Sequence, residues 1–151
     1  MKISKKGDYA LRALLQLALN HGRGVTQMKD IAAKEAIPKK FLEQILLNLK
    51  GAGLVQSKSG AGGGYMLSKH PKGIALGDII RVVDGPLAPV RCVSKYFHVS
   101  CPREKRCCIR GIMQDVRDVT AKILDNISLA DMCDRSRGLS ARKERVLRYY
   151  V

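Results

Sequence analysis

The stretch from Met28 to Ser68 constrains the fold more strongly than any other part of the sequence. Its first half holds two short amphipathic segments, and its second half holds two short apolar runs around a glycine-rich tip. Pro38 separates the amphipathic segments, because it keeps Ile37 out of the helical region and suits the start of the helix that follows. This order predicts a helix-turn-helix followed by a two-stranded wing.

Each helix of the predicted pair has an apolar side. In the first, Ile31, Ala32 and Ala36 follow Met28 at helical spacing, and Thr26 stands where a residue caps the N-terminus. In the second, the predicted buried stripe consists of Phe41, Leu42, Ile45, Leu46 and Leu49.

The polar face of the second helix is the predicted DNA-reading surface. Near the N-terminal end this face carries Lys39, Lys40, Glu43 and Gln44, and Met28 lies close by at the start of the first helix. Side chains of these types reach base edges and phosphates in the major groove. An ordinary amphipathic helix with a solvated face has the same spacing, so the spacing alone leaves both interpretations open.

The glycine-rich tip favours the DNA-binding interpretation. Its four glycines, Gly60, Gly62, Gly63 and Gly64, permit positive φ angles in a tight turn between apolar runs at 54–58 and 65–67. A tip without side chains also approaches a phosphate backbone closely. The predicted wing contacts are Ser57, Ser59, Gly60, Gly62, Gly63 and Tyr65. GAGGGY is not a dinucleotide-binding motif, because a short strand and not a helix follows it.

Charge and composition narrow the partners. The chain has 151 residues, enough for one domain, and a formal net charge of +15. Such an excess favours a polyanion, with nucleic acid before a membrane surface. The sequence has no apolar run of membrane-spanning length and no signal-peptide core at its start, which predicts a cytoplasmic protein without a membrane partner. Five cysteines, an odd number, favour a metal, a cluster or reactive thiols over disulfides.

The predicted fold class is mainly α with a small β wing. We expect a winged helix-turn-helix domain at 1–85, a cysteine-containing sensor loop at 86–108, a dimerisation helix region at 109–132 and a basic tail at 133–151. A short further element is predicted to begin at Ser128, and the tail is predicted to be mobile, with partial helix near RKERVLRYYV. Within the first domain, Ser4 is placed to cap a helix that extends to about Asn20, and another helix is predicted from Leu76 to Asp84.

The helix predicted from Ile109 to Ser128 carries a long apolar stripe. The stripe consists of Ile109, Ile112, Met113, Val116, Val119, Ile123, Leu124 and Ile127. Twenty residues form a rod of about 30 Å, and a rod with one apolar side needs a partner surface. Packing on its own domain is one solution. Pairing with a second copy is favoured, because operator-binding winged helices act as two-fold dimers.

Four cysteines lie within the predicted loop, at Cys92, Cys101, Cys107 and Cys108. They form no C-x-x-C pair, so a zinc finger or a thioredoxin-like site has little support. Three thiolates on one loop suit a [2Fe–2S] or [4Fe–4S] cluster, with one ligand from elsewhere. The flanking basic residues are Arg91, Arg103, Lys105, Arg106 and Arg110. Their charge favours thiolates, which also suits a reactive thiol without a metal.

Three segments resemble the IscR/NsrR-type (BadM/IscR-like) winged-helix transcription regulators: YALRALLQLA, FLEQILLNLKGAGLVQSKSGAGGGYMLS and ALGDIIRVVDG. The resemblance extends from about Ile3 to about Met132. It implies a bacterial homodimer that binds a palindromic operator in double-stranded DNA. Many members of this family carry an iron–sulfur cluster, and others sense without one.

The resemblance also implies ligands. Cys92 and Cys101 match the first two cysteines of cluster-binding members, Cys108 matches the third, and Cys107 is the alternative to Cys108. Asp8 stands where NsrR-type members have an acidic fourth ligand from the partner subunit, although it also suits a plain helix-start residue. Two further positions bear on the ligand set: IscR-type members have a histidine where this chain has Gly111, and His98 is a local alternative.

We therefore predict a transcription regulator, a repressor and not an enzyme, that senses nitric oxide, redox state or iron–sulfur status through a cluster. A regulator of the same fold that responds to thiol oxidation or to a metabolite is the first alternative. A small thiol oxidoreductase using Cys107 and Cys108 would leave the helix-turn-helix unexplained. A nonspecific nucleic-acid-binding protein would leave the cysteine loop unexplained. Cys133 lies outside the loop and is expected to be inert.

Overall fold

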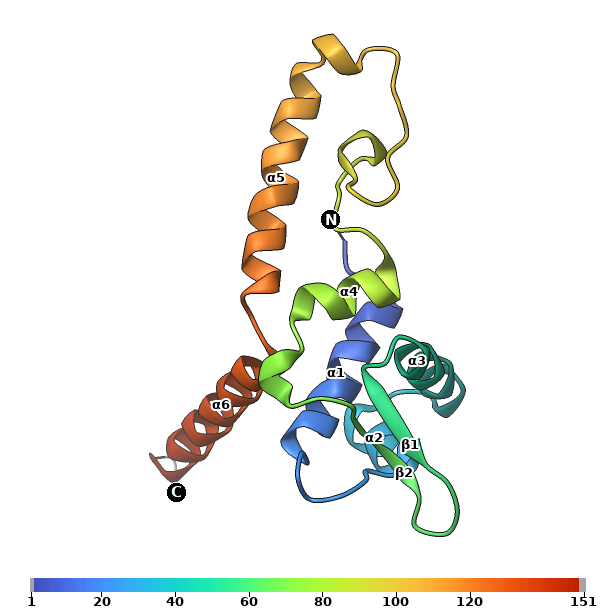
Figure 1. Ribbon diagram of the computed structural model, residues 1–151. Coiled ribbons are helices and arrows are strands. Elements are labelled where there is room, and N and C mark those ends of the chain that lie inside the picture. The colour runs from blue at the N-terminus through green and yellow to red at the C-terminus, as the bar shows by residue number, and fades with distance from the viewer. Residues whose placement is uncertain (1, 150–151) are drawn as a thin grey trace.

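Six α-helices and one two-stranded antiparallel sheet make up the described part of the chain (Figure 1). The computed structural model describes residues 2–149, with side chains as far as Arg142. The helices are α1 (Lys5–Leu19), α2 (Met28–Glu35), α3 (Lys39–Gly51), α4 (Leu76–Asp84), α5 (Cys108–Asp125) and α6 (Leu129–Tyr149). The strands are β1 (Val55–Lys58) and β2 (Gly64–Leu67), and short 3-10 turns lie at η1 (Pro71–Gly73), η2 (Arg91–Val93) and η3 (Glu104–Arg106). The predicted fold class is confirmed.

Helix α1 lies at the centre of the fold. As predicted, Ser4 caps it, and the Ser4 hydroxyl accepts a hydrogen bond from the Gly7 amide at 3.0 Å. Ala10, Ala13 and Leu14 are fully buried, and α1 contacts α2, α3, α4, α6 and β2. The core of the molecule therefore surrounds this one helix.

The helix-turn-helix forms at the predicted place with one different cap. Helix α2 ends at Glu35. Its C-cap, Ala36, adopts a left-handed conformation (φ 51°), and Ile37 is buried in the turn. The predicted cap at Thr26 is wrong, because Gln27 holds the N-cap position without a side-chain hydrogen bond. The Thr26 hydroxyl instead accepts from the Asn20 amide at 3.0 Å.

The buried stripe of α3 is narrower than predicted. Leu42, Ile45, Leu46 and Leu49 are buried. Phe41 is 60% exposed, so its predicted burial is wrong. These three leucines and one isoleucine already occupy the i, i+3, i+4 and i+7 positions that face the core, and Phe41 lies outside that set.

The wing is tied to the helix-turn-helix at its base. Strands β1 and β2 pair antiparallel, with Val55 opposite Leu67 and Lys58 opposite Gly64. Thr26 and Tyr65 exchange two backbone hydrogen bonds of 2.8 and 2.9 Å. The segment before α2 thus holds the second strand of the wing.

An ion pair joins α4 to α5. Arg81 binds both carboxylate oxygens of Asp125, at 2.7 and 2.8 Å. Gly77 lies directly below this contact, and a Cβ there would collide with the Asp125 carboxylate. A side chain at position 77 would therefore displace the Asp125 carboxylate from its pair with Arg81.

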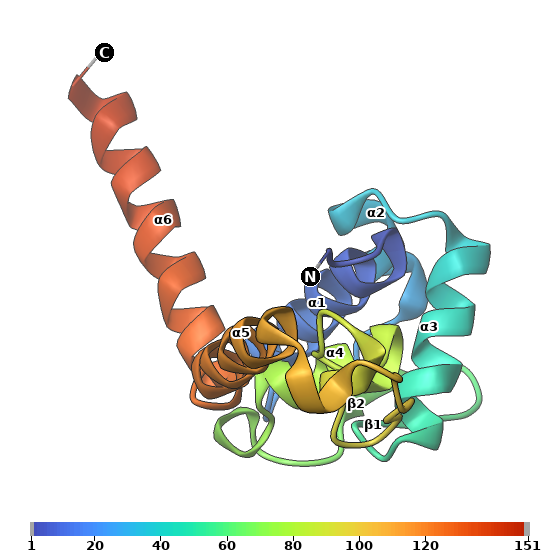
Figure 2. The same cartoon turned by 90° about the horizontal axis from the view of Figure 1, so that it is seen from above.

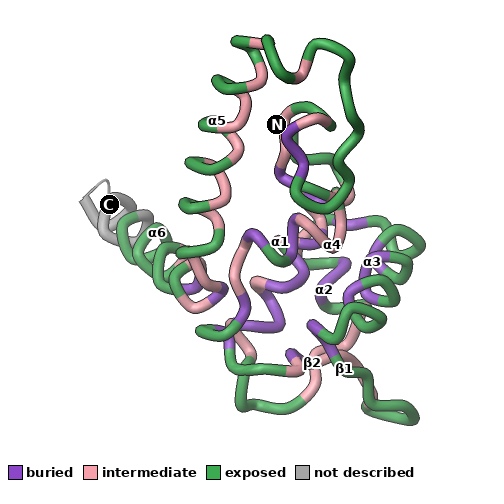
Figure 3. The backbone as a smooth tube through the Cα atoms, turned by 45° about the horizontal axis from the view of Figure 1, so that its top comes forward, coloured by how far each residue is buried: buried purple, intermediate pink, exposed green. Residues whose placement is uncertain are grey.

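Helix α5 extends away from the body of the molecule, and none of its residues, all within the described chain, is fully buried (Figure 3). The predicted apolar stripe divides in two. Its outer members are 43–60% exposed, and they are Ile109, Ile112, Val116, Val119 and Ile123. Its other members, Met113, Leu124 and Ile127, are half-buried.

The element predicted to begin at Ser128 is present, and it is longer than expected: α6 is a single helix from Leu129 to Tyr149 that projects from the body (Figure 2). The tail, predicted to be helical only near its end at 142–151, is therefore helical from its start at Cys133. Ser128 starts it through a reciprocal cap with Asp131, whose backbone and side chain both bond to Ser128. Leu129 and Cys133 are buried at its base. The side chains beyond Arg142, including predicted basic ones of the tail, lie outside the described residues. Within the described chain, no helix combines the length and apolarity needed to span a membrane.

We expect Asp125→Asn to lower the free energy of unfolding by about 1 kcal/mol at pH 7, because a neutral amide loses the charge-assisted pair with Arg81. Thermal unfolding should then show a Tm lower by about 2–4 °C. The hydrogen bond from Arg81 lowers the pKa of Asp125. The stabilisation is therefore complete above the ordinary carboxyl pKa of about 3.9 and disappears as the pH falls through the lowered value.

The matched control is Asp115→Asn, which removes an equal charge from an exposed position of the same helix. Equal Tm changes in both variants would show that the Arg81–Asp125 pair adds nothing beyond net charge.

Candidate nucleic-acid interface and cysteine loop

The outer face of α3 carries the predicted DNA-reading side chains. Lys39, Lys40, Glu43 and Gln44 are all exposed. Phe41 and Leu47, 60% and 53% exposed, share this outer surface. Sequence reasoning missed both as surface residues, although the four buried positions of the helix already completed its inward pattern. An apolar side chain on such a face suits the methyl group of thymine.

Helix α2 offers a smaller part of Met28 for DNA contact than the sequence predicted. Met28 begins this helix and is half-buried against the core, so only part of its side chain faces outward. Lys29, the next residue, is exposed. The individual DNA contacts stay predictions.

The wing tip uses its glycines in two ways. Gly60 and Gly62 have positive φ angles of 94° and 75°, as expected. Gly63 and Gly64 do not have the positive φ angles that were expected. They are needed because a side chain would not fit at either position. A Cβ on Gly63 would collide with the Lys58 carbonyl oxygen, and a Cβ on Gly64 with that of Thr26.

A side-chain contact fixes the wing against α3. The Lys50 ammonium donates to the Ser57 hydroxyl at 2.6 Å, joining the end of α3 to β1. Ser57, Ser59, Gly60 and Gly62 are exposed, whereas Gly63 and Tyr65 are half-buried. The recognition helix and the predicted wing contacts therefore belong to one connected unit.

The cysteine loop lies at the far end of the molecule, beside the start of α5 (Figure 1). Cys92 is half-buried in η2, Cys101 is exposed, and Cys107 and Cys108 stand at the N-terminus of α5. All are free thiols, as is the buried Cys133. Burial raises the pKa of the Cys133 thiol, which keeps it protonated and agrees with the expectation that it is inert.

Polar contacts hold this loop to α5. The carboxylate of Glu104 bonds to His98 Nε2 at 3.0 Å and pairs with Arg110 at 3.1 Å. The hydrogen bond with His98 lowers the pKa of Glu104. The Glu104 amide also donates to the Cys101 carbonyl oxygen at 2.9 Å.

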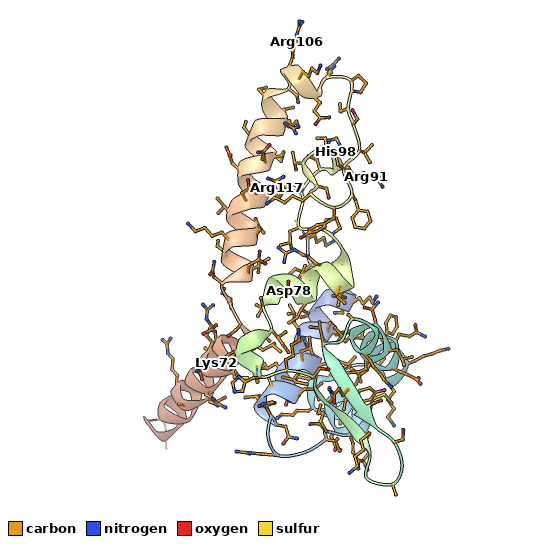
Figure 4. The ribbon with its side chains drawn as sticks, viewed as in Figure 1. Lys72, Asp78, Arg91, His98, Arg106 and Arg117 are labelled. Carbon is orange, nitrogen blue, oxygen red and sulfur yellow. The ribbon has the colours of Figure 1, made fainter. Side chains whose placement is uncertain are left out.

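A second contact lies further along α5. Arg117 donates to the Val93 carbonyl oxygen at 2.5 Å, next to Cys92, and also pairs with Asp118. Figure 4 shows Arg117 directed from α5 toward the loop that carries Arg91 and His98. Two backbone carbonyl groups at the cysteines thus take part in the contacts with α5. The Val93 carbonyl, next to Cys92, accepts from Arg117, and the Cys101 carbonyl accepts from Glu104, which pairs with Arg110.

The cysteine thiols of the loop are chemically suited to bind iron, but they are not arranged around one metal position in this structure. Three thiols on one basic loop are soft ligands of the kind that iron–sulfur clusters take. Nevertheless, no three Cys, His, Asp or Glu side chains of the described chain are gathered closely enough to hold a metal ion. Asp8 pairs with Arg12 on its own helix at 2.9 Å, and His98 is engaged by Glu104. The ligand set of Cys92, Cys101, Cys108 or Cys107, and Asp8 stays a prediction.

Comparisons with known proteins agree with the predicted resemblance. The sequence profile of the Rrf2 family, described as iron-dependent transcriptional regulators, matches residues 3–135. The HTH-type transcriptional regulator CymR of Bacillus subtilis is 39% identical over 138 residues, which cover 91% of this chain and 94% of that protein. The regulator IscR of Escherichia coli is 35% identical over 132 residues, covering 87% and 80%.

A solved structure gives the same result for the fold. The structure of CymR (YrzC), the global cysteine regulator of B. subtilis, is similar to this chain with a TM-score of 0.73 and 37% identity. The match covers 89% of this chain and 98% of that one. The predicted resemblance to winged-helix regulators is thus confirmed in sequence and in fold.

We expect Gly64→Val to lower DNA affinity at least about 10-fold, because the collision with Thr26 displaces the wing from the helix-turn-helix. Fluorescence anisotropy on a duplex selected from a random library measures this loss, and sedimentation should show an unchanged oligomeric state. Gly138→Val on α6 is the control, since a Cβ at Gly138 meets no atom within 4 Å. Unchanged affinity of Gly64→Val would place the wing away from the DNA.

Proposed function

The chain belongs to the Rrf2 family of DNA-binding transcriptional regulators, and from this premise we propose that it represses transcription as a homodimer on a palindromic operator, under the control of its cysteine loop. The observation that carries the proposal is the exposed polar face of α3, held together with the wing on the core around α1. A rigid unit of this kind suits base reading, because binding groups must be fixed before they select a sequence.

Base reading is assigned to Glu43 and Gln44, and phosphate contact to Lys39 and Lys40. An amide side chain such as that of Gln44 forms two hydrogen bonds with adenine in the major groove. A lysine ammonium, in contrast, attracts the phosphates of any sequence. Phe41 adds an apolar group beside them that suits thymine.

The exposed stripe of α5 supports the homodimer. Ile109, Ile112, Val116, Val119 and Ile123 follow one another at spacings of three and four, the repeat that pairs two helices. A continuous apolar strip of this length is unusual on a free surface and marks an interface. A second copy is the proposed partner, because a palindromic operator mirrors a two-fold protein.

The proposed sensor is an iron–sulfur cluster held by Cys92, Cys101 and either Cys108 or Cys107, with Asp8 of the partner subunit as the fourth ligand. The iron-dependent description of the family and the four free thiols on one basic loop, of which three would be ligands, support this assignment. A bound cluster supplies a centre that reacts with nitric oxide and oxidants. The chain's own part is mechanical: Glu104 and Arg117 connect the loop to α5, so a change in the loop alters contacts of the helix proposed to pair the two subunits.

A regulator without a cluster is the second candidate. The thiols of the described chain are not gathered as metal ligands, and the similar CymR is described as a global cysteine regulator. In that case the exposed Cys101 and Cys108 would respond to oxidants directly. The oxidoreductase alternative is not proposed, since the similar proteins are transcriptional regulators.

For base reading, we expect Gln44→Ala to cost about 1–3 kcal/mol on the operator and much less on random DNA, because only the operator offers its specific partner. Anisotropy titrations on both duplexes measure the difference. Lys39→Gln is the contrasting variant and should weaken both duplexes equally. Equal losses for Gln44→Ala on both duplexes would count against base reading.

For the dimer, Val116→Asp should bury an unpaired charge in the proposed interface, which is strongly unfavourable. Sedimentation should then find monomers, and operator affinity should fall at least about 10-fold because each monomer holds only half a site. Ala141→Asp adds the same charge at an exposed position of α6 and serves as control. If the Val116→Asp protein stays dimeric, the stripe is not the dimer interface.

For the sensor, anaerobic reconstitution with iron and sulfide should give visible absorbance that is lost in Cys92→Ser and Cys101→Ser, because a thiolate ligand is removed. Cys107→Ser and Cys108→Ser compare the two candidates for the third ligand. Asp8→Ala should leave a less stable cluster, and Cys133→Ala should behave as wild type. A wild-type protein that stays colourless and iron-free would favour the regulator without a cluster.

A further inference from the structure

A cleft of about 310 Å³ opens where the end of α1, the η1 turn and the first turns of α6 meet. Its floor is formed by Ala18, Pro71 and Cys133, which are buried. Its rim carries the basic side chains His21, Arg23, His70, Lys72 and Arg137. Figure 4 shows Lys72 at the base of α6, far from the cysteine loop.

The charge of this cleft is positive and comes from three separate segments. Arg23 lies in the turn after α1, Lys72 in η1 and Arg137 on α6. Asp134 is the one carboxylate among the lining residues, and it pairs with Arg137 at 3.1 Å. Three fixed cations against one anion leave an excess of positive charge, before any protonation of the two histidines. Basic groups that converge on a hollow differ from the scattered lysines of a basic surface.

The histidines are held in a defined orientation. The His70 ring caps η1, where its Nδ1 accepts the Lys72 backbone N–H at 3.2 Å. Because Nδ1 accepts, Nε2 carries the proton of the neutral ring and is a donor. The His21 ring lies edge-on against His70, with centroids 5.1 Å apart. The rim therefore offers imidazole N–H, ammonium and guanidinium donors together.

We infer that this cleft binds a phosphate group. Guanidinium and ammonium groups beside a preset N–H donor match the charge and the several acceptor oxygens of phosphate. Arg23 also lines the neighbouring hollow with Asp30 and Lys34 of α2. The cleft thus adjoins the helix-turn-helix, which favours a backbone phosphate of DNA beside the sequence that α3 reads. The DNA source rests on the proposed function, whereas the phosphate chemistry does not.

The first arm of the test uses DNA. Lys72→Gln should weaken binding to operator and random duplexes alike, by about 3–10-fold, and lower the slope of log affinity against log salt by about 1, as loss of one phosphate contact does. Arg142→Gln removes an equal charge from an exposed position of α6 outside the cleft and is the matched control. It should leave the slope closer to that of the wild type.

The second arm uses inorganic phosphate and pyrophosphate without DNA. The chain has three histidines, so NMR signals of their rings report the site directly. Millimolar phosphate should shift the signals of His21 and His70 but leave His98 of the cysteine loop unchanged, and Lys72→Gln should abolish the shift. Shifts without any DNA effect identify a small phosphate compound, and a DNA effect matched to the cleft identifies the backbone.

Two results overturn the inference together: no histidine shift, and a loss of DNA affinity no larger in Lys72→Gln than in Arg142→Gln. The proposed function fails separately, if the wild-type protein binds no duplex at all. In that case the phosphate arm still decides whether the cleft is a phosphate site.

Discussion

Close packing on α1 is the constraint on which the DNA-binding unit depends. Ala10, Ala13 and Leu14 leave α1 with small and medium side chains at its fully buried positions, so α2, α3 and α4 approach it closely. Interiors packed in this way move as one body, because a shift of one helix opens voids around the others. The outer face of α3 and the wing base at Thr26 and Tyr65 therefore keep one relative position. A surface that reads bases requires that rigidity.

The connection from this body to α5 is of a different kind. It includes the Arg81–Asp125 pair, the bridge between Ala75 and Ser128 and the contact of Gly77 with the Asp125 carboxylate, and no residue of α5, which the structure describes throughout, is fully buried. The loop is joined to α5 in the same way, through Glu104 and Arg117. Partly exposed ion pairs contribute only about 0–1 kcal/mol each, far less than a buried apolar core. Polar contacts of this strength therefore link the cysteine loop to α5, and α5 to the body around α1.

The sequence predicted those parts of the fold that local rules decide. The helix at Leu76–Asp84, the Ser4 cap and the wing followed from periodicity, capping chemistry and turn residues. The misses depended on tertiary packing. Thr26 has a side chain suited to a cap, but its backbone is committed to Tyr65 and its hydroxyl to Asn20. Phe41 is apolar but lies outside the face that meets α1.

The residues of the candidate site likewise fall into those that the sequence predicts and those that only tertiary packing brings together. The polar face of α3 follows from helical spacing, and its four predicted residues are exposed. The basic cleft between α1, η1 and α6 had no sequence signal, because Arg23, Lys72 and Arg137 are far apart in the chain and meet only through the fold. The cysteine loop has no period that fixes its path, so spacing alone did not show whether its thiols converge. The start of α6 near Ser128 followed from the sequence, whereas the burial of Leu129 and Cys133 that anchors it to the core depends on tertiary packing.

The charge of the chain links the two proposed associations. Each chain carries a formal net charge of +15, so two chains that pair through α5 repel each other over the whole surface. At about 0.1 M salt, exposed charges more than about 10 Å apart are largely screened from each other, which weakens this repulsion and favours the dimer. The same salt weakens DNA binding, because release of counterions from the duplex is then less favourable. DNA itself neutralises the repulsion when both subunits are bound. Dimerisation and operator binding should therefore reinforce each other most at low salt, where the free chains repel each other most strongly.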